Sequence, residues 1–112
     1  MPNQDARLDP LFRALADPTR RAVLERLSQA PAAVSELASS FDMALPSFLQ
    51  HLRLMEECGL VRSRKTGRVR TYRLVPRSLK PAEDWMARQR ALWERRLDQL
   101  DQFVKDLKES EK

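Results

Sequence analysis

The stretch VRSRKTGRVRTYRLV at residues 61–75 constrains the fold of this chain more than any other part of its sequence. Apolar and basic side chains alternate on both sides of the central Gly67. Alternation with a period of two is typical of a β-strand, and a glycine between two such runs is typical of a hairpin turn. We therefore predict a hairpin with strands over 60–65 and 68–75 and a turn at Thr66-Gly67. Because burying an unpaired charge costs a large free energy, the hairpin must leave its basic side chains in water or against an anion. These side chains are Arg62, Arg64, Lys65, Arg68, Arg70 and Arg73.

The positive charge of the chain is concentrated in its middle third. The whole sequence has 21 basic and 16 acidic residues, a formal net charge of +5. Residues 44–75 carry seven basic and two acidic side chains, whereas residues 1–43 have a net charge of −1 and residues 76–112 have +1. A concentrated basic patch indicates a polyanion as partner.

The rest of the chain is predicted to be helical. The sequence has only two glycines in 112 residues and 33% charged residues, which favours a helix-rich protein. Asp9-Pro10 and Asp17-Pro18 each combine a capping side chain with a proline suited to the first helical position. The predicted fold class is mainly α with a small β-hairpin, in one domain over residues 1–112. The helices are expected over 8–16, from Pro18 onward, and over 34–41, 45–58 and 81–107.

Residues 34–58 are predicted to form a helix-turn-helix unit. Phe48, Leu52 and Met55 recur at helical spacing and turn one face of the second helix inward. The opposite face then fits the major groove of DNA, where Gln bridges adenine and Arg bridges guanine. The hairpin is interpreted as a wing over 60–75 that neutralises phosphates, so the fold becomes a winged helix-turn-helix with five helices and a two-stranded wing. The residues predicted to contact DNA are Ser47, Leu49, Gln50, His51 and Arg53 in the helix and Arg62, Arg64, Lys65, Arg68 and Arg70 in the wing.

Four side chains of this helix have two interpretations each. Leu45 and Leu49 either contact thymine methyl groups or pack against the wing or the neighbouring helix. His51 either bonds a phosphate or is an ordinary hydrogen-bonding residue at a helix edge. Cys58 is favoured as a half-buried apolar filler, because a redox-sensing thiol needs a lowered pKa or a resolving partner.

The last helix is predicted to carry a dimer interface. Trp93, Leu97, Leu100, Val104 and Leu107 follow one another at steps of four and three, which is the heptad pattern of a coiled-coil seam. A small domain does not cover so long an apolar stripe, so a partner helix is expected, although folding back on the first helix is also compatible with the pattern. Helices 8–16 and 81–107 are therefore assigned to dimerisation. The predicted interface residues are Leu8, Leu11, Phe12, Trp85, Leu92, Trp93, Leu97, Leu100 and Val104.

The composition argues against several other classes of protein. One cysteine and one histidine are too few for a zinc site, so neither a metal nor a cofactor is expected. No defensible acid–base pair, Ser–His–Asp set or Gly-rich phosphate loop is present, so the chain is not expected to be an enzyme. No apolar run is long enough to span a membrane and the N-terminus is not a secretory signal, which indicates the cytoplasm.

The sequence resembles the ArsR family of bacterial winged helix-turn-helix repressors. The resemblance covers about residues 8–107 and rests on LADPTRRAVLERL, VSELA, LQHLRLMEECGLVRSRKTGRVRTYRL and DWMARQRALWERRLDQLD. It implies a homodimeric, operator-binding regulator with its recognition helix at 45–58, its wing at 60–75 and dimer contacts from the terminal helices. Metal-sensing members of the family carry cysteines near SELASS or Asp and His ligands in the last helix. Here Ala38, Ser39 and Ser40 take the place of such cysteines, and the last helix has no histidine, so metal sensing of those kinds is not expected.

A second departure concerns the recognition helix. Many relatives have Ser followed by a basic residue before the HL pair, whereas this chain has Leu49 and Gln50. A different operator sequence is therefore expected.

We therefore predict a homodimeric, sequence-specific regulator that binds double-stranded DNA and acts as a repressor. The alternative is a winged-helix module that binds another protein through its long helix and does not bind DNA. The unbalanced charge of the wing argues against that alternative. An RNA-binding role is disfavoured because Tyr72 is the only aromatic residue on the sheet that can stack on a base.

Overall fold

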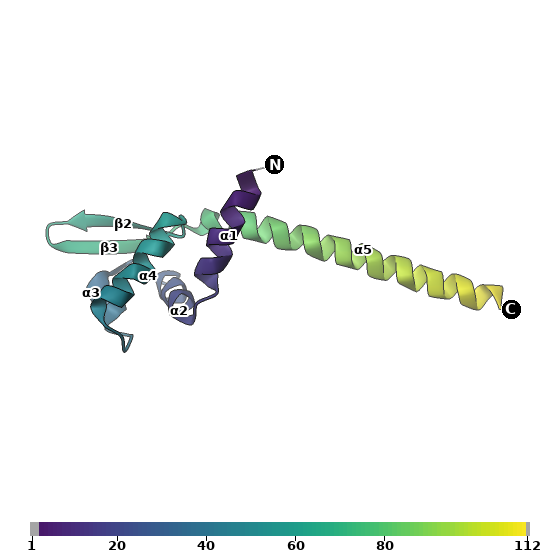
Figure 1. The fold of residues 1–112 in the computed structure, drawn as a ribbon, viewed down its shortest axis with the longest axis horizontal. Helices are drawn as coiled ribbons and strands as arrows, with labels where there is room; N and C mark the ends of the chain where they lie inside the picture. The colour runs from purple at the N-terminus through teal and green to yellow at the C-terminus, as the bar shows by residue number, and fades with distance from the viewer. Residues whose placement is uncertain (1–2, 112) are drawn as a thin grey trace. The chain divides into compact units, whose positions relative to one another are not determined.

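The computed structural model describes residues 3–111, with side chains from residue 6 onward, and divides into two units, Met1–Pro81 and Ala82–Lys112. The mainly α fold class with a small hairpin is confirmed (Figure 1). None of the described helices is long and apolar enough to cross a membrane. The elements in chain order are α1 (Asn3–Leu15), α2 (Pro18–Leu27), β1 (Ala32–Ala33), α3 (Val34–Ala38), α4 (Leu45–Glu57), β2 (Val61–Thr66), β3 (Val69–Leu74), a 3-10 turn (Pro76–Leu79) and α5 (Lys80–Ser110).

Helix α1 begins at Asn3, so the predicted start at Asp9-Pro10 is wrong. Pro10 lies inside the helix and cannot donate a hydrogen bond to the carbonyl of Ala6. Both residues are exposed, so water can satisfy that carbonyl and the cost of the interior proline is reduced. Continuing the helix through Pro10 keeps Leu8 and Leu11, which are both buried, on one face.

Helix α2 begins where the sequence predicts. Asp17 is its N-cap in an extended conformation, and the Asp17 carboxylate accepts a hydrogen bond of 3.0 Å from the backbone N–H of Arg20. Pro18 occupies the first turn. Val23 and Leu27 are buried and fix the helix in the core of the first unit.

The sheet has three strands in the order β1-β3-β2, one more than predicted. The additional strand is Ala32–Ala33, which pairs antiparallel with β3 through Ala32 opposite Tyr72. A two-residue alanine segment has no strand pattern of its own, so only the partner strand reveals it.

The helix-turn-helix unit consists of α3 and α4, and α3 is shorter than its predicted range of 34–41. Phe48, Leu52 and Met55 of α4 are buried, as predicted. The helix ends at Glu57 with Cys58 as its C-cap, and Gly59 follows with a φ of +85°, which is accessible to glycine at little cost. The N–H of Leu60 donates to the carbonyl of Met55 at 3.0 Å and the N–H of Gly59 donates to Glu56 at 3.1 Å. This is a Schellman cap, and it turns the chain directly into the wing.

Strands β2 and β3 form the predicted hairpin, with Thr66 opposite Val69. The two turn residues are Gly67 and Arg68, one position later than predicted. Gly67 has a φ of +63°, and no other residue of the turn has a positive φ. A positive φ at the first central position alone is the requirement of a type II′ turn, which fits the twist of a hairpin. The tip of the hairpin projects beyond α3 and α4 (Figure 1).

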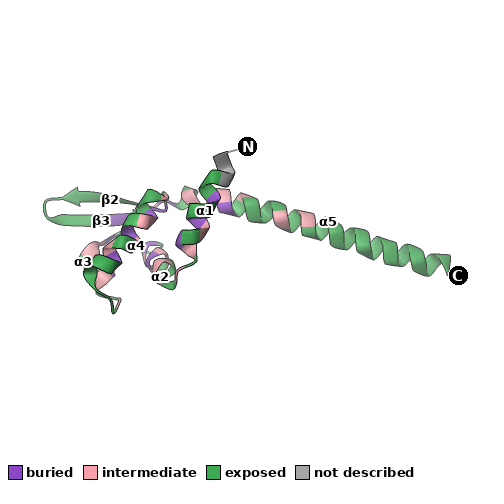
Figure 2. Ribbon diagram, viewed as in Figure 1, coloured by how far each residue is buried: buried purple, intermediate pink, exposed green. Residues whose placement is uncertain are grey.

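The second unit is the greater part of α5, a helix of 31 residues without an internal break. Figure 2 shows it exposed along most of its length. Trp93 is 67% exposed although it is one of the largest apolar side chains. The exposed apolar residues of α5 are Trp85, Met86, Trp93, Leu97, Leu100, Phe103, Val104 and Leu107.

Candidate nucleic-acid interface

The outward face of α4 carries polar side chains that are free to meet a partner. Ser47, Gln50 and Arg53 are exposed, and they lie on the side of the helix away from its buried residues. A helix held by one buried face presents the other at a fixed orientation. The structure therefore brings together three of the five helix residues predicted to contact DNA.

The apolar residues of α4 differ in exposure. Leu45, the first residue of the helix, is 51% exposed, whereas Leu49 is half-buried. About half of the surface of Leu45 is therefore accessible to a partner. Leu49 is partly packed within the chain and partly accessible.

The wing is divided into a buried base and an exposed outer part (Figure 2). Val61 and Tyr72 are buried at the base. Side chains alternate between the faces of a strand, so the face opposite these residues carries Arg62, Arg64 and Arg73. Three arginines thus lie on this outward face, together with Thr71, which is opposite Arg64.

Like charges lie directly opposite one another in the wing. Arg62 is paired with Arg73 across the two strands, and Lys65 is paired with Arg70. Cross-strand pairs of like charge are destabilising. No carboxylate lies within 4.0 Å of any of the six basic side chains in the part of the chain that the structure describes. An external anion such as a phosphate would relieve this repulsion.

One hydrogen-bond chain connects the wing to α4. Arg70 donates to the Ser63 hydroxyl at 2.8 Å, and that hydroxyl donates to the Glu56 carboxylate at 2.9 Å. The backbone N–H of Ser63 also donates to Glu56, at 3.3 Å. Glu56 belongs to α4, so this chain fixes the base of the wing relative to the candidate recognition helix. Sequence spacing gave no sign of this link.

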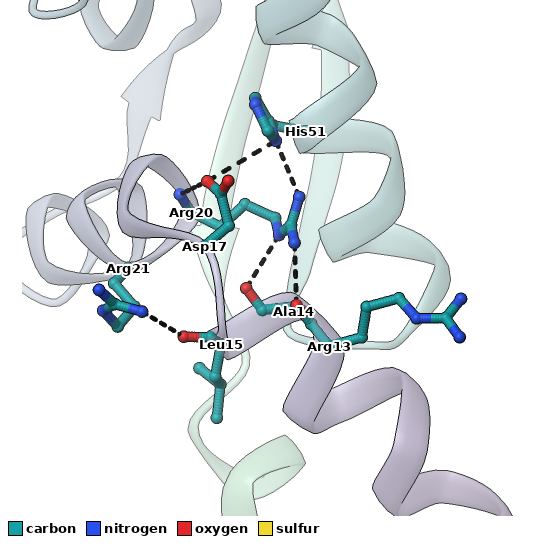
Figure 3. Close-up of polar contacts among 7 residues, drawn as sticks. All are labelled: Arg13, Ala14, Leu15, Asp17, Arg20, Arg21 and His51. Atoms are coloured by element: carbon teal, nitrogen blue, oxygen red, sulfur yellow. Dashed lines mark hydrogen bonds and ion pairs between the residues drawn. The ribbon is translucent and has the colours of Figure 1, made fainter.

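A second polar cluster holds α4 against α1 and α2 (Figure 3). The Arg20 guanidinium donates to the carbonyls of Ala14 at 2.9 Å and Arg13 at 2.8 Å, which lie in the last turn of α1. It also donates through Nη1 to Nδ1 of His51 on α4, at 2.9 Å. One side chain therefore joins three helices. The sequence predicts Asp17 only as the cap of a helix, and it gives no sign of the role of Arg20.

The contact with Arg20 gives the two ring nitrogens of a neutral His51 different roles. A guanidinium is only a donor, so Nδ1 accepts and the ring proton lies on Nε2. Only Nε2 remains to bond a phosphate. The Asp17 carboxylate lies 4.0 Å from the same Nδ1. The backbone N–H of Arg20 is the main reason that the pKa of Asp17 is lowered from its ordinary value.

Cys58 is half-buried at the end of α4. Its Sγ donates to the carbonyl of Met55 at 3.4 Å, and burial raises the pKa of the thiol. A raised pKa keeps the thiol protonated, which favours the filler over the redox sensor. Among the described residues, no group of three or more His, Cys, Asp or Glu side chains is arranged to hold a metal ion.

The residues assigned to dimerisation fall into two groups. Leu8 and Leu11 are already buried in the single chain, and Phe12 is half-buried, so they offer a partner little apolar area. The group on α5 is different, because all but Leu92 are exposed: Trp85, Trp93, Leu97, Leu100 and Val104.

Known proteins are similar to this chain in sequence and in fold. A family model described as a helix-turn-helix domain matches residues 15–64. The HTH-type transcriptional regulator Rv2034 of Mycobacterium tuberculosis is 44% identical over 71 residues, which are 63% of this chain and 66% of that protein. The match thus spans just under two thirds of that relative.

The alignments with solved structures cover more of this chain than the alignment with that relative does. An ArsR family transcriptional regulator is 53% identical with a TM-score of 0.78, over 80% of this chain and 93% of that one. An ArsR-like transcriptional regulator from Rhodococcus sp. RHA1 is 33% identical with a TM-score of 0.78, over 91% of this chain and 96% of that one.

Proposed function

The chain belongs to the ArsR family of winged helix-turn-helix transcriptional regulators, and on that premise we propose that it is a homodimer that binds an operator in double-stranded DNA and represses transcription there. Regulators of this family bind DNA and are not enzymes. In the proposal, α4 enters the major groove and the wing follows the phosphate backbone. Since the chromosome is its target, the expected location is the cytoplasm.

The single observation that carries the proposal is the charge of the wing. Its six basic side chains are exposed, two cross-strand pairs are of like charge, and no carboxylate pairs with them among the described residues. A solvated surface usually mixes both signs of charge, whereas a surface that meets phosphates does not.

The exposed face of α4 supports reading of the bases. Gln50 can bridge N6 and N7 of adenine, and Arg53 can bridge O6 and N7 of guanine. Ser47 can bond either a base edge or a phosphate. The Arg20 and Glu56 links hold this helix against α1, α2 and the wing, so the side chains that read the bases lie on a helix held in a fixed position.

The partner that we assign to α5 is a second copy of the chain. Its apolar residues recur at the steps of a coiled-coil seam and are exposed. Leu100→Glu places a charge in the centre of this seam and is expected to yield monomers in sedimentation equilibrium at a protomer concentration where the wild type is dimeric. Ala91→Glu adds the same charge at an exposed position off the seam and is the control. A dimer that survives Leu100→Glu contradicts this assignment.

The experiment for the proposed function is capture of fragmented DNA from the source genome by the purified protein, followed by sequencing. We expect enrichment of promoter fragments and a footprint with two half-sites about one helical turn apart. Parallel captures with zinc or with EDTA test our proposal that binding needs no metal. Failure to enrich any fragment at low salt, together with formation of a heterodimer, would instead support the protein-binding alternative.

A further inference from the structure

The beginning of α4 is apolar and exposed. Residues 42–47 are all exposed, and they include Met43, which is 36% exposed, and Leu45, which is 51% exposed. The N-cap of the helix is Ala44, which makes no side-chain capping bond. Helix starts favour Ser, Thr, Asp or Asn at this position, so the chain forgoes a stabilising polar cap where it presents apolar side chains.

Leu45 shares a row along α4 with one of the base-reading side chains, Arg53. Leu45, Leu49 and Arg53 are spaced by four residues and form one row along the helix. In a helix-turn-helix protein the first residues of the recognition helix are those that meet base edges. Leu45 precedes the buried Phe48 and Leu52 by three and seven residues, but it lies in the first turn of the helix, which is exposed up to Ser47. In the proposed complex the exposed part of this apolar side chain at the end of the helix therefore meets the edge of a base.

The one methyl group that the major groove of unmodified DNA offers is the C5-methyl group of thymine, whereas the other bases are marked there by hydrogen-bond donors and acceptors. We propose that Leu45, flanked by Met43, is a specificity-determining residue that recognises a thymine methyl group at the operator position in front of the α4 N-terminus. The proposal rests on the proposed function, since it names a feature of the DNA that α4 reads.

The test uses a single chemical change in the DNA. In the captured operator, each thymine is replaced in turn by uracil, which lacks the methyl group and keeps the same hydrogen-bonding edges. The dissociation constant of each duplex is measured for the unchanged protein by fluorescence anisotropy. We expect one symmetry-related pair of positions at which uracil weakens binding, by about fourfold for each methyl group removed from an apolar environment.

Two variants assign that methyl group to its partner. Leu45→Ala should bind the thymine and uracil duplexes with equal affinity. Val69→Ala is the matched control, because Val69 is also 51% exposed but lies in the wing. It should keep the full difference between thymine and uracil.

The proposal is overturned if the protein binds its operator and uracil at every thymine leaves the dissociation constant unchanged. It is also overturned if Leu45→Ala retains the difference between the two bases. If the protein binds no duplex at all, the proposed function itself fails. The uracil series on the unchanged protein needs no variant, so poor folding of Leu45→Ala does not affect the decision.

Discussion

Arg20→Met tests how much the polar contacts between α4 and the helices α1 and α2 contribute to stability, separately from the apolar packing of α4. Methionine keeps an unbranched stem and removes every donor. The bonds that disappear are those to the carbonyls of Ala14 and Arg13 at the end of α1 and to His51 on α4. Removing one guanidinium therefore removes polar contacts among three helices and leaves their apolar packing in place.

The expected cost follows from the number and exposure of these bonds. A hydrogen bond that involves a charged group contributes about 1.5–3 kcal/mol where water is excluded. The bond to the Arg13 carbonyl is exposed and is taken to contribute nothing to the free energy of unfolding, and the bonds to Ala14 and His51 are only partly buried. The carbonyls left behind at the end of α1 can bind water. We therefore expect a loss of about 2–3 kcal/mol in the free energy of unfolding.

The assay is urea unfolding followed by far-ultraviolet circular dichroism, at equal protomer concentrations because dimerisation contributes to stability. The control is Arg21→Met, in the same turn of α2, where the guanidinium donates one exposed bond of 2.8 Å to the carbonyl of Leu15. That variant should lose at most about 0.5 kcal/mol, as is usual for surface positions. If both variants lose the same small amount, the Arg20 cluster does not hold the three helices together.

Two further predictions concern titratable groups. Asp17→Ala should cost about 1 kcal/mol at neutral pH, because it removes the N-cap of α2. Folding lowers the pKa of Asp17 below 3.8, so the wild-type advantage should be complete above that value and diminish as the pH falls through the lowered pKa, and a pH-independent difference in urea unfolding contradicts the cap. Burial raises the pKa of Cys58, so at neutral pH the folded protein should react with iodoacetamide more slowly than the same protein in urea. Equal rates contradict the protected thiol.

The parts of the fold that the sequence predicts well are those with a strong local period. Phe48, Leu52 and Met55 mark the buried face of α4, and the alternation around Gly67 marks the wing. In both cases the apolar pattern needs no distant partner to be interpreted.

The parts that were missed depend on distant partners or on solvent. The Asp9-Pro10 pair is a sound helix start, but exposure of Pro10 and Ala6 lets α1 continue through it. The strand at Ala32–Ala33 exists because β3 supplies its hydrogen bonds. The bond between Arg20 and His51 joins two helices that are far apart in sequence, and no local sequence pattern predicts it.

The central claim is that the basic side chains of the wing neutralise DNA phosphates, and the salt dependence of binding tests it most directly. The affinity for the operator is measured over a series of salt concentrations for the wild type and for a variant that combines Arg64→Gln with Arg68→Gln. Arg26→Gln is the control, because that arginine pairs with Glu36 at 3.6 Å outside the wing. We predict that the slope of log K against log salt becomes shallower by about 0.9 for each phosphate that the protein no longer neutralises, hence by about 1.8 in the double variant, while the control keeps the wild-type slope. Parallel lines for the wild type and the double variant would contradict the claim.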